Sequence, residues 1–303
     1  MVIMPPFRIP LSAFVRLCGK KTAKSHNGAQ SILLKTNRKP HERLAGKLRE
    51  QIRTAVREVR ELNSSNKNHR MCYYQPMNDS VLNFLFQKPP SQKTGVAFIG
   101  GNAPPSDVSA LLAKNADIVV AADSGLLAAR RAGIAPDWIV GDMDSLPDDG
   151  ILAQYPAEKV LRYPRDKDLL DTEIALNLLR EKGCRYIVLA GGGGGRLDHL
   201  LALRALFDRP LCPALWVTDG EAVFRVDEGG TLTLAPGKRA RVSVLPAGRG
   251  PWKARSAGLK WPLDGLAIRR GWTGISNETE EDEASVTSLR GRFLVMTALA
   301  LIG

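Results

Sequence analysis

The stretch DIVVAADSGLLAARRAG, residues 117–133, joins two patterns that together indicate the fold class. The apolar run DIVVAA, residues 117–122, predicts a short strand. The segment GLLAARRAG, residues 125–133, has the spacing of a helix. A strand that leads into a helix is the repeating unit of a parallel α/β sheet.

The same alternation continues on both sides of this stretch. Strands and helices at this spacing imply a doubly wound, Rossmann-like parallel sheet. The further strands are expected in GVAFIG (95–100), DWIV (137–140), EKVLRY (158–163), RYIVLA (185–190) and ALWVT (214–218). The further helices are expected in DVSALLAKN (107–115), DLLDTEIALNLLREKG (168–183) and LDHLLALRALF (197–207).

Beyond Gly220 the helical patterns cease. Short apolar runs separated by Gly and Pro predict a smaller all-β domain, shaped as a sandwich or barrel. These runs are EAVFRV (221–226), GTLTLA (230–235), RARVSVLP (239–246), DGLAIR (264–269), ASVTSLR (284–290) and GRFLVMTAL (291–299).

The N-terminal part differs from the rest in charge. The chain has 303 residues and a formal net charge of +12. Residues 1–93 hold 18 Lys and Arg against 5 Asp and Glu, whereas residues 94–303 hold 25 against 26. The overall charge is therefore no argument for nucleic-acid binding by the globular part. One amphipathic helix is predicted in the extension by Leu44, Leu48, Ile52, Val56, Val59 and Leu62.

We expect three segments: the basic, poorly ordered extension (1–93), an α/β catalytic domain (94–218) and a β-rich domain (219–303). Three interpretations of the extension stay open. It is a transit peptide for import into an organelle, a segment upstream of a true start at Met71 or Met77, or an interaction arm.

Cysteines, histidines and hydropathy narrow the class of protein. Four cysteines, at positions 18, 72, 184 and 212, have no metal-ligand spacing and indicate reduced thiols, which favours the cytoplasm. Only His199 lies beyond residue 93, which argues against a zinc site in the globular part. No apolar run approaches the roughly 20 residues of a membrane span.

Carboxylates follow the predicted strands one after another. In a parallel sheet the carboxyl ends of the strands share one edge, which is where such folds bind ligands. Like charges gathered there would repel, and a hard cation such as Mg²⁺ resolves the conflict. The acids at this edge are Asp123, Asp142, Asp144, Asp166, Asp168, Asp171 and Asp198.

A glycine run indicates that a phosphate group binds at the same edge as the cation. Gly191 to Gly195 can turn tightly, and their N–H groups can face an anion at the start of the next helix. Arg196 adds a planar donor fork suited to phosphate oxygens.

Simpler interpretations remain for each of these features. Asp142 and Asp144 also fit a solvated turn, and the glycines a flexible one. Asp168 and Asp171 also fit the N-terminus of a helix, where a negative charge is electrostatically favourable. His199 fits a helix residue that packs or caps locally.

These residues belong to motifs by which the chain resembles the thiamine pyrophosphokinase (thiamine diphosphokinase) family across about 95–300. The motifs are specific because six of them occur in the family's order. They are ADSG (122–125), GDMDS (141–145), DKDLLDTEIAL (166–176), GGGGGRLDH (191–199), GLKWPL (258–263) and GISNE (274–278).

The resemblance implies transfer of a diphosphate group from ATP to the hydroxyl of thiamine, giving thiamine diphosphate and AMP, by a homodimer with its active sites at the subunit interface. It implies that Asp142, Asp144 and Asp171 hold Mg²⁺ and that Asp123 and Asp198 complete the catalytic acids. By the same resemblance the phosphates of ATP are contacted by Lys167, Arg196, Gly193 and Gly194, and thiamine by Trp261, Ser276 and Asn277.

Two positions depart from the family pattern. Leu170 stands where a threonine is usual, and Leu203 where an asparagine is frequent. Neither change touches a carboxylate, so we expect activity to survive. Two other functions stay open: a pyrophosphokinase for a pterin-like alcohol, and a non-catalytic binder of thiamine or nucleotide. GLKWPL and GISNE count against the first, and the intact acidic set against the second.

Overall fold

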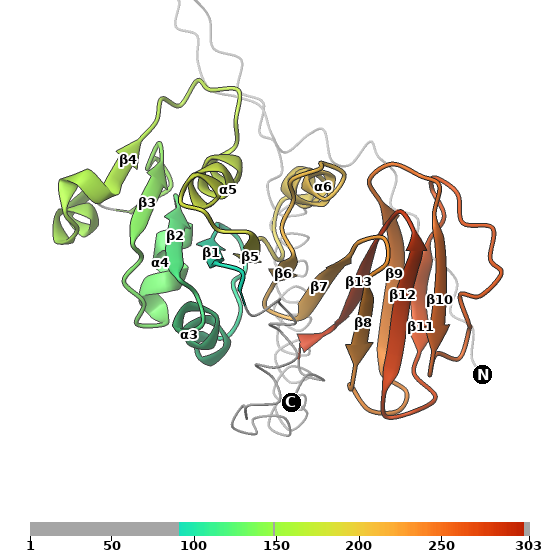
Figure 1. Cartoon of the computed structure of the whole chain (residues 1–303). Coiled ribbons are helices and arrows are strands. Elements are labelled where there is room, and N and C mark those ends of the chain that lie inside the picture. Colours follow the sequence, from blue (N-terminus) through green and yellow to red (C-terminus); the bar gives the residue numbers. More distant parts are fainter. Residues whose placement is uncertain (1–90, 148, 300–303) are drawn as a thin grey trace, which may run out of the picture. The chain divides into compact units, whose positions relative to one another are not determined.

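The computed structural model describes residues 91–147 and 149–299 (Figure 1). The predicted amphipathic helix and the rest of the extension up to residue 90 lie outside the described residues. None of the helices in the described part combines the length and the apolar character needed to cross a bilayer.

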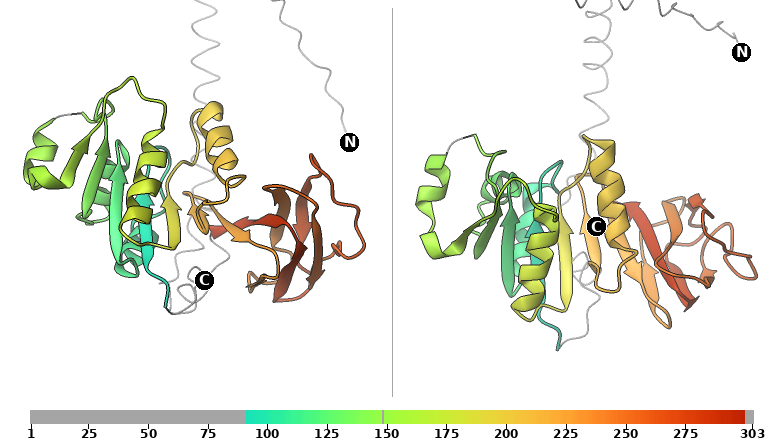
Figure 2. Two further views of the ribbon diagram at one scale, coloured as in Figure 1. Left: turned by 45° about the horizontal axis from the view of Figure 1, so that its top comes forward. Right: turned by 90° about the horizontal axis from the view of Figure 1, so that it is seen from above.

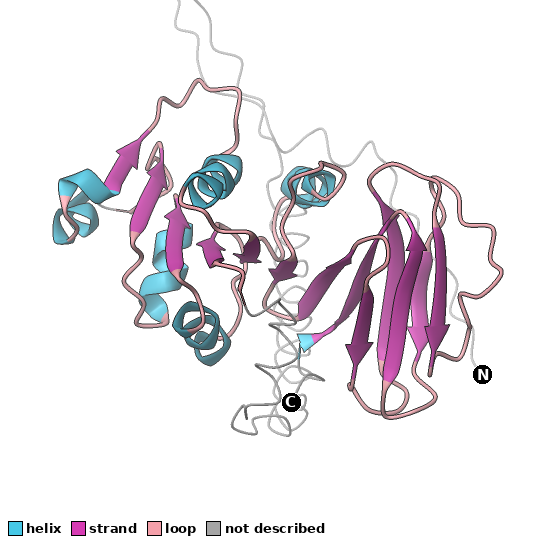
Figure 3. Cartoon of the chain, viewed as in Figure 1, coloured by secondary structure: helices cyan, strands magenta, loops and turns pink. Residues whose placement is uncertain are grey.

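Six parallel strands form the first half of the main sheet, in the order β4-β3-β2-β1-β5-β6. Figure 3 shows them with helices on both faces. The predicted doubly wound sheet is therefore confirmed. The strands are β1 (Thr94–Phe98), β2 (Ile118–Ala122), β3 (Trp138–Gly141), β4 (Val160–Arg162), β5 (Tyr186–Ala190) and β6 (Leu215–Val217).

Alternate residues of the strands meet different helices. In β1, Val96 and Phe98 join one core cluster, to which α3 (Ser106–Lys114) and α4 (Gly125–Arg131) contribute. Ala97 lies in another cluster, to which α5 (Asp171–Glu181) and α6 (Leu197–Leu206) contribute. Each face of the sheet is thus covered by two helices, and the carboxyl ends of the strands are left for the connecting loops.

The β-rich region is not separated from this sheet. β6 pairs antiparallel with β7, and β13, β9 and β11 follow in the same ten-stranded sheet (Figure 2). A three-stranded sheet has the order β10-β12-β8. The strands are β7 (Glu221–Val226), β8 (Thr231–Leu234), β9 (Arg241–Ala247), β10 (Lys253–Ala257), β11 (Gly274–Glu278), β12 (Ala284–Arg290) and β13 (Arg292–Ala298).

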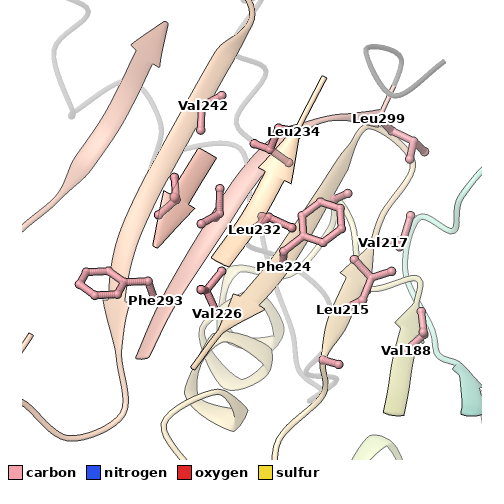
Figure 4. Close-up of a cluster of buried hydrophobic side chains, with 14 of the residues drawn as sticks. Val188, Leu215, Val217, Phe224, Val226, Leu232, Leu234, Val242, Phe293 and Leu299 are labelled. Carbon is pink, nitrogen blue, oxygen red and sulfur yellow. The ribbon is translucent and has the colours of Figure 1, made fainter. Parts of the chain in front are cut away.

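Apolar residues of both sheets form one core (Figure 4). Leu232 and Leu234 come from β8, while Phe224, Val242 and Phe293 come from the longer sheet. Residues of successive strands that point the same way thus build a sandwich, as the period-2 patterns predict.

Three local features of the structure differ from the prediction. DGLAIR (264–269) is irregular, although Ile268 is buried. The strands β10 and β11 were not predicted, because KARSA buries only Ala254 and GISNE buries only Asn277.

Helix α5 begins at Asp171 rather than at residue 168. Leu170 is extended, and its N–H donates to the Glu173 carboxylate at 3.0 Å. Two short 3₁₀ helices, Asp149–Gln154 and Ala157–Lys159, precede β4.

Candidate active site

Three carboxylates converge at the carboxyl ends of β2 and β3. Asp123, Asp142 and Asp144 each place one oxygen within 4.8 Å of the others. Asp123 Oδ1 is buried and has no hydrogen-bond partner among the described residues. Oxygen-only donors and a buried carboxylate oxygen without a donor both fit a hard divalent cation such as Mg²⁺.

Local backbone geometry holds these acids in place. Asp123 has φ = 49°, in the left-handed region, and its N–H donates to Val140 O at 2.9 Å. The Asp144 N–H donates to Asp142 Oδ1 at 3.1 Å, so the loop after β3 is closed by its own carboxylate. Left-handed residues other than glycine often mark functional sites.

A glycine allows the acids of three elements to approach. Gly141, at the end of β3, has φ = 138°. A Cβ at this position would lie 3.1 Å from Asp171 Oδ1 and 3.3 Å from Asp123 Cβ. A larger residue would therefore push the carboxylates apart.

Lys167 lies between two of the predicted acids. Its Nζ is 3.1 Å from Asp142 Oδ2 and 3.2 Å from Asp171 Oδ1. Burial alone would lower the pKa of Lys167, but hydrogen bonds to both carboxylates outweigh it and raise the pKa. The Asp144 N–H, with help from Lys167, lowers the pKa of Asp142, whereas burial raises that of Asp171. Lys167 thus stays charged and neutralises part of the acidic edge.

A pocket of about 400 Å³ opens beside the acids. Asp123 and Asp171 line it, as do Gly194, Arg196 and His199. Three further lining residues were not singled out in the sequence, although each stands next to an acid or within a quoted motif: Ser124, Ser145 and Thr172. His199, for which a purely local role was one interpretation, is among the residues that line this pocket.

The glycine run is anchored at its start and open at its end. Gly192 N–H donates to Gly100 O at 2.8 Å, and Gly193 N–H donates to Asn102 O at 3.1 Å. Gly193 does not line the pocket, whereas Gly194 does. The Gly193 N–H is already used, so it is not available to a phosphate, in contrast to the prediction.

Asn102 is a second feature that the motifs did not indicate. Its N–H donates to Gly193 O, and its Nδ2 donates to Asp219 Oδ2 at 3.0 Å. A Cβ on Gly194 would lie 2.6 Å from this amide nitrogen. The backbone of Asn102 therefore bridges to the glycine loop at Gly193, and its side chain lies against Gly194.

Asp198 is paired with Arg196 rather than with the other acids. Arg196 Nη2 lies 2.6 Å from Asp198 Oδ2, and Nε lies 3.1 Å from Oδ1. This hydrogen-bonded pair lowers the pKa of Asp198. Both side chains are exposed, and Arg196 lines the pocket while Asp198 does not. Asp198 positions the guanidinium fork and does not join the group formed by Asp123, Asp142 and Asp144.

The predicted thiamine residues form a separate cluster in the β-rich region. Trp261 is 52% exposed, so it is not a residue of the core. Asn277 is buried, and its amide accepts from Trp261 N–H at 3.1 Å and donates to Trp261 O at 2.7 Å. Asn277 therefore holds the Trp261 backbone. Ser276 is exposed and, like Asp123, left-handed, with φ = 60°.

The two departures from the family pattern differ in their surroundings. Leu170 lines the pocket and is exposed. Leu203 also lines the pocket but is buried, and a Cβ on Gly192 would lie 2.4 Å from its Cδ1. Leu203 therefore packs under the glycine loop.

Two family models match the chain and together span more than half of it. "Thiamin pyrophosphokinase, catalytic domain" matches residues 109–209, and "Thiamin pyrophosphokinase, vitamin B1 binding domain" matches residues 231–292. The first spans the three carboxylates and the glycine loop, and the second spans Trp261.

Individual relatives agree with these models. The curated thiamine pyrophosphokinase of Bacillus subtilis is 25% identical over 182 residues, which is 58% of this chain and 85% of that protein. A solved thiamin pyrophosphokinase from Geobacillus thermodenitrificans is 27% identical with a TM-score of 0.52, covering 68% of this chain and 96% of that one. The solved B. subtilis thiamine pyrophosphokinase, 24% identical, has a TM-score of 0.56, covers 68% and 99%, and supports the fold.

Proposed function

The chain belongs to the thiamin pyrophosphokinase family, and we propose from this premise that it transfers a diphosphate group from ATP to the hydroxyl of thiamine, giving thiamine diphosphate and AMP. The observation that carries the proposal is the group of Asp123, Asp142 and Asp144 beside a glycine-lined pocket. The vitamin B1 binding match disfavours a pterin-like substrate, and the match to the catalytic domain disfavours a non-catalytic regulator.

Asp123, Asp142 and Asp144 would hold Mg²⁺, and Asp171 stands beside them, linked through Lys167. The metal ion, when bound, neutralises negative charge on the triphosphate. The chain's own cations add to this effect. Arg196 and Gly194 line the pocket, and Lys167 lies at its edge beside Asp142 and Asp171, so these three residues would contact the phosphates of ATP.

The acceptor hydroxyl attacks the β-phosphorus, and its proton passes to a carboxylate of this edge. The bond between the β-phosphorus and the oxygen that bridges it to the α-phosphate breaks, and AMP leaves with that oxygen. Because little covalent help is needed, positioning and charge neutralisation supply most of the rate. Asp198 contributes by orienting the Arg196 fork.

Thiamine carries a cationic thiazolium ring, which the exposed indole of Trp261 suits. The Lys260 ammonium lies 4.6 Å from the centre of that indole ring, a contact of the same kind as the one proposed for the thiazolium ring. Ser276 stands next to Asn277 in the GISNE motif and offers a hydroxyl. Asn277 keeps the Trp261 backbone in place. A homodimer, implied by the family resemblance, would bring this cluster to the acidic edge of the second subunit. We place the enzyme in the cytoplasm, with organellar import through the extension as the alternative.

The test is an assay of AMP release. Purified protein with ATP and Mg²⁺ is given thiamine, a pterin alcohol, or no acceptor. AMP and thiamine diphosphate in equal amounts with thiamine alone support the proposal. AMP release with the pterin alcohol, or no release with any acceptor, would contradict it.

A further inference from the structure

A second pocket, of about 330 Å³, shares no lining residue with the one beside the acids. It lies where the segment after α6 meets the end of β9 and the irregular segment before β11. Three arginines and one acid line it: Arg204, Arg249, Arg270 and Asp208. Its wall therefore carries a net positive charge, which favours an anionic ligand.

One of these arginines is already paired. Arg204 Nη1 donates to Asp208 Oδ1 at 2.9 Å, and its Nη2 donates to Pro246 O at 2.9 Å. The Gly248 N–H donates to the same Asp208 oxygen at 2.7 Å. Asp208 is thus neutralised by its neighbours and does not oppose an incoming anion.

The other two arginines are free to bind. Within the part of the chain that the structure describes, Arg249 and Arg270 form no hydrogen bond or ion pair, and both are exposed. Each guanidinium is a planar fork that matches a phosphate or carboxylate group. Two forks in one pocket match a dianion such as a diphosphate.

An indole forms the apolar wall of the same pocket. Trp252 is half-buried, and its Nε1 donates to Ala247 O at 2.8 Å. A Cβ on either Gly250 or Gly291 would lie 2.7 Å from the ring, so two glycines leave room for it. With its N–H engaged and its position fixed, Trp252 offers an apolar surface to a planar ring.

We propose that this pocket binds an organic diphosphate that carries a planar ring, with the phosphates on Arg249 and Arg270 and the ring against Trp252. The two sources of this chemistry are a nucleotide diphosphate and thiamine diphosphate, and only the second rests on the proposed function. The pocket is a non-catalytic site, separate from the acidic edge.

The test is calorimetric titration of the full chain with inorganic pyrophosphate, ADP and thiamine diphosphate, each in the presence of EDTA. Removing divalent metal weakens binding at the acidic edge, where an anion needs the cation. Wild type is expected to bind at least one ring-bearing diphosphate at one site per chain. The double variant Arg249→Gln/Arg270→Gln should weaken this binding on the order of a hundredfold or more, since a hydrogen bond to a charged group is worth ~1.5–3 kcal/mol.

Matched variants test the phosphate-binding part and the ring-binding part of the pocket separately. Arg255→Gln, an exposed arginine on β10, should leave binding unchanged. Trp252→Phe should weaken ADP or thiamine diphosphate several-fold and leave pyrophosphate unchanged. Turnover of the double-arginine variant should equal that of wild type, since neither residue lies at the acidic edge.

Equal affinity of wild type and the double variant for every probe would overturn the proposal, as would the absence of binding to wild type. Loss of turnover in the double variant at normal melting temperature would also overturn it, because the arginines would then serve the reaction. If thiamine gives no AMP while ADP still binds through Arg249 and Arg270, the proposed function fails and this pocket stands.

Discussion

Asp142 combines two roles in one side chain: it belongs to the group with Asp123 and Asp144, and its Oδ2 accepts a hydrogen bond from Lys167. Asp142→Asn removes a charge from that group while keeping the size of the side chain. We expect turnover at saturating Mg²⁺ to fall by about two orders of magnitude or more, about 1.4 kcal/mol of transition-state stabilisation per tenfold. Steady-state kinetics with a melting curve provides the measurement. Asp282→Asn, at an exposed position in the β11–β12 turn, is the control and should keep normal turnover. Near-normal turnover of the Asp142 variant would remove it from the metal site.

Trp261 offers a prediction about substrate selection. A cation on an indole is worth ~0.5–2 kcal/mol, so Trp261→Ala should raise the KM for thiamine from several-fold to about thirtyfold. The KM for ATP and the melting temperature should change little, because Trp261 is exposed.

The control for this variant is Trp272→Ala, because Trp272 is half-buried and packs against the core. That change should lower the melting temperature. If Trp261→Ala behaves in the same way and raises both KM values alike, thiamine recognition does not rest on this ring.

Single residues could be predicted where the signal is local. Asp123, Asp142 and Asp144 stand directly after strands, and their convergence follows from the parallel sheet. The roles of Asn102 and Asn277 could not be predicted in this way. Their partners lie 117 and 16 residues away along the chain, and no spacing rule connects them.

At the scale of elements, we predict that the glycine loop depends on the side chain of Asn102. Asn102→Ala keeps the backbone bridge to Gly193 but removes the hydrogen bond to Asp219. A hydrogen bond of this kind is worth about 1 kcal/mol or more, so we expect the KM for ATP to rise roughly fivefold with a smaller change in kcat. Asn115→Ala, which removes only a local bond to Leu111 O, should leave the KM unchanged. An unchanged KM in both variants would show that the loop needs no such support.

Strand β5 carries a group that makes stability depend on pH. Burial raises the pKa of Tyr186 to about 12, against about 10 in an unfolded chain. The neutral phenol is favoured in the folded state. Its contribution is therefore fully present below about pH 10 and lost as the pH rises toward 12.

The test compares wild type with Tyr186→Phe by denaturant unfolding at several pH values. The free energy of unfolding of wild type should fall relative to the variant by ~2–3 kcal/mol, at about 1.4 kcal/mol per pKa unit. Parallel curves for the two proteins between pH 9 and 12 would show that Tyr186 ionises without penalty.

Elements with a strong periodic pattern were predictable, and polar edge elements were not. The strand β11 is polar because it lies at the edge of the sheet, and its register with β9 shifts between Gly274 and Asn277. The segment DGLAIR has the composition of a strand, and its Ile268 is buried. The segment nevertheless pairs with no strand of either sheet. Burial therefore does not separate a strand from an irregular segment over such short runs.

For the whole molecule, the basic extension is expected to be dispensable for catalysis. The described fold begins with β1 at Thr94, and the carboxylates and the pockets all lie beyond it. A chain that starts at Met77 should be soluble, with kcat and both KM values within about twofold of the full chain. Loss of most of the activity, or failure to fold, would show that residues before Met77 belong to the enzyme.

The order of the strands in the whole sheet could not be predicted. An α/β domain followed by a β-rich domain was expected, but no pattern in the sequence indicated that β6 and β7 pair directly and join both into one sheet. Such pairing is decided by contacts between segments distant in sequence, which composition and periodicity do not encode.

β13 has a further consequence for synthesis of the protein. It is the described strand nearest the C-terminus, yet it pairs with β7 on one side and with β9 on the other. Until residues 292–298 leave the ribosome, those two strands have no bridge between them, and both keep open edges that invite pairing with other chains. The sheet is therefore completed only after residues 292–298 have been synthesised, and a chain cut short before Arg292 is expected to aggregate or to be degraded rather than to retain a working α/β half.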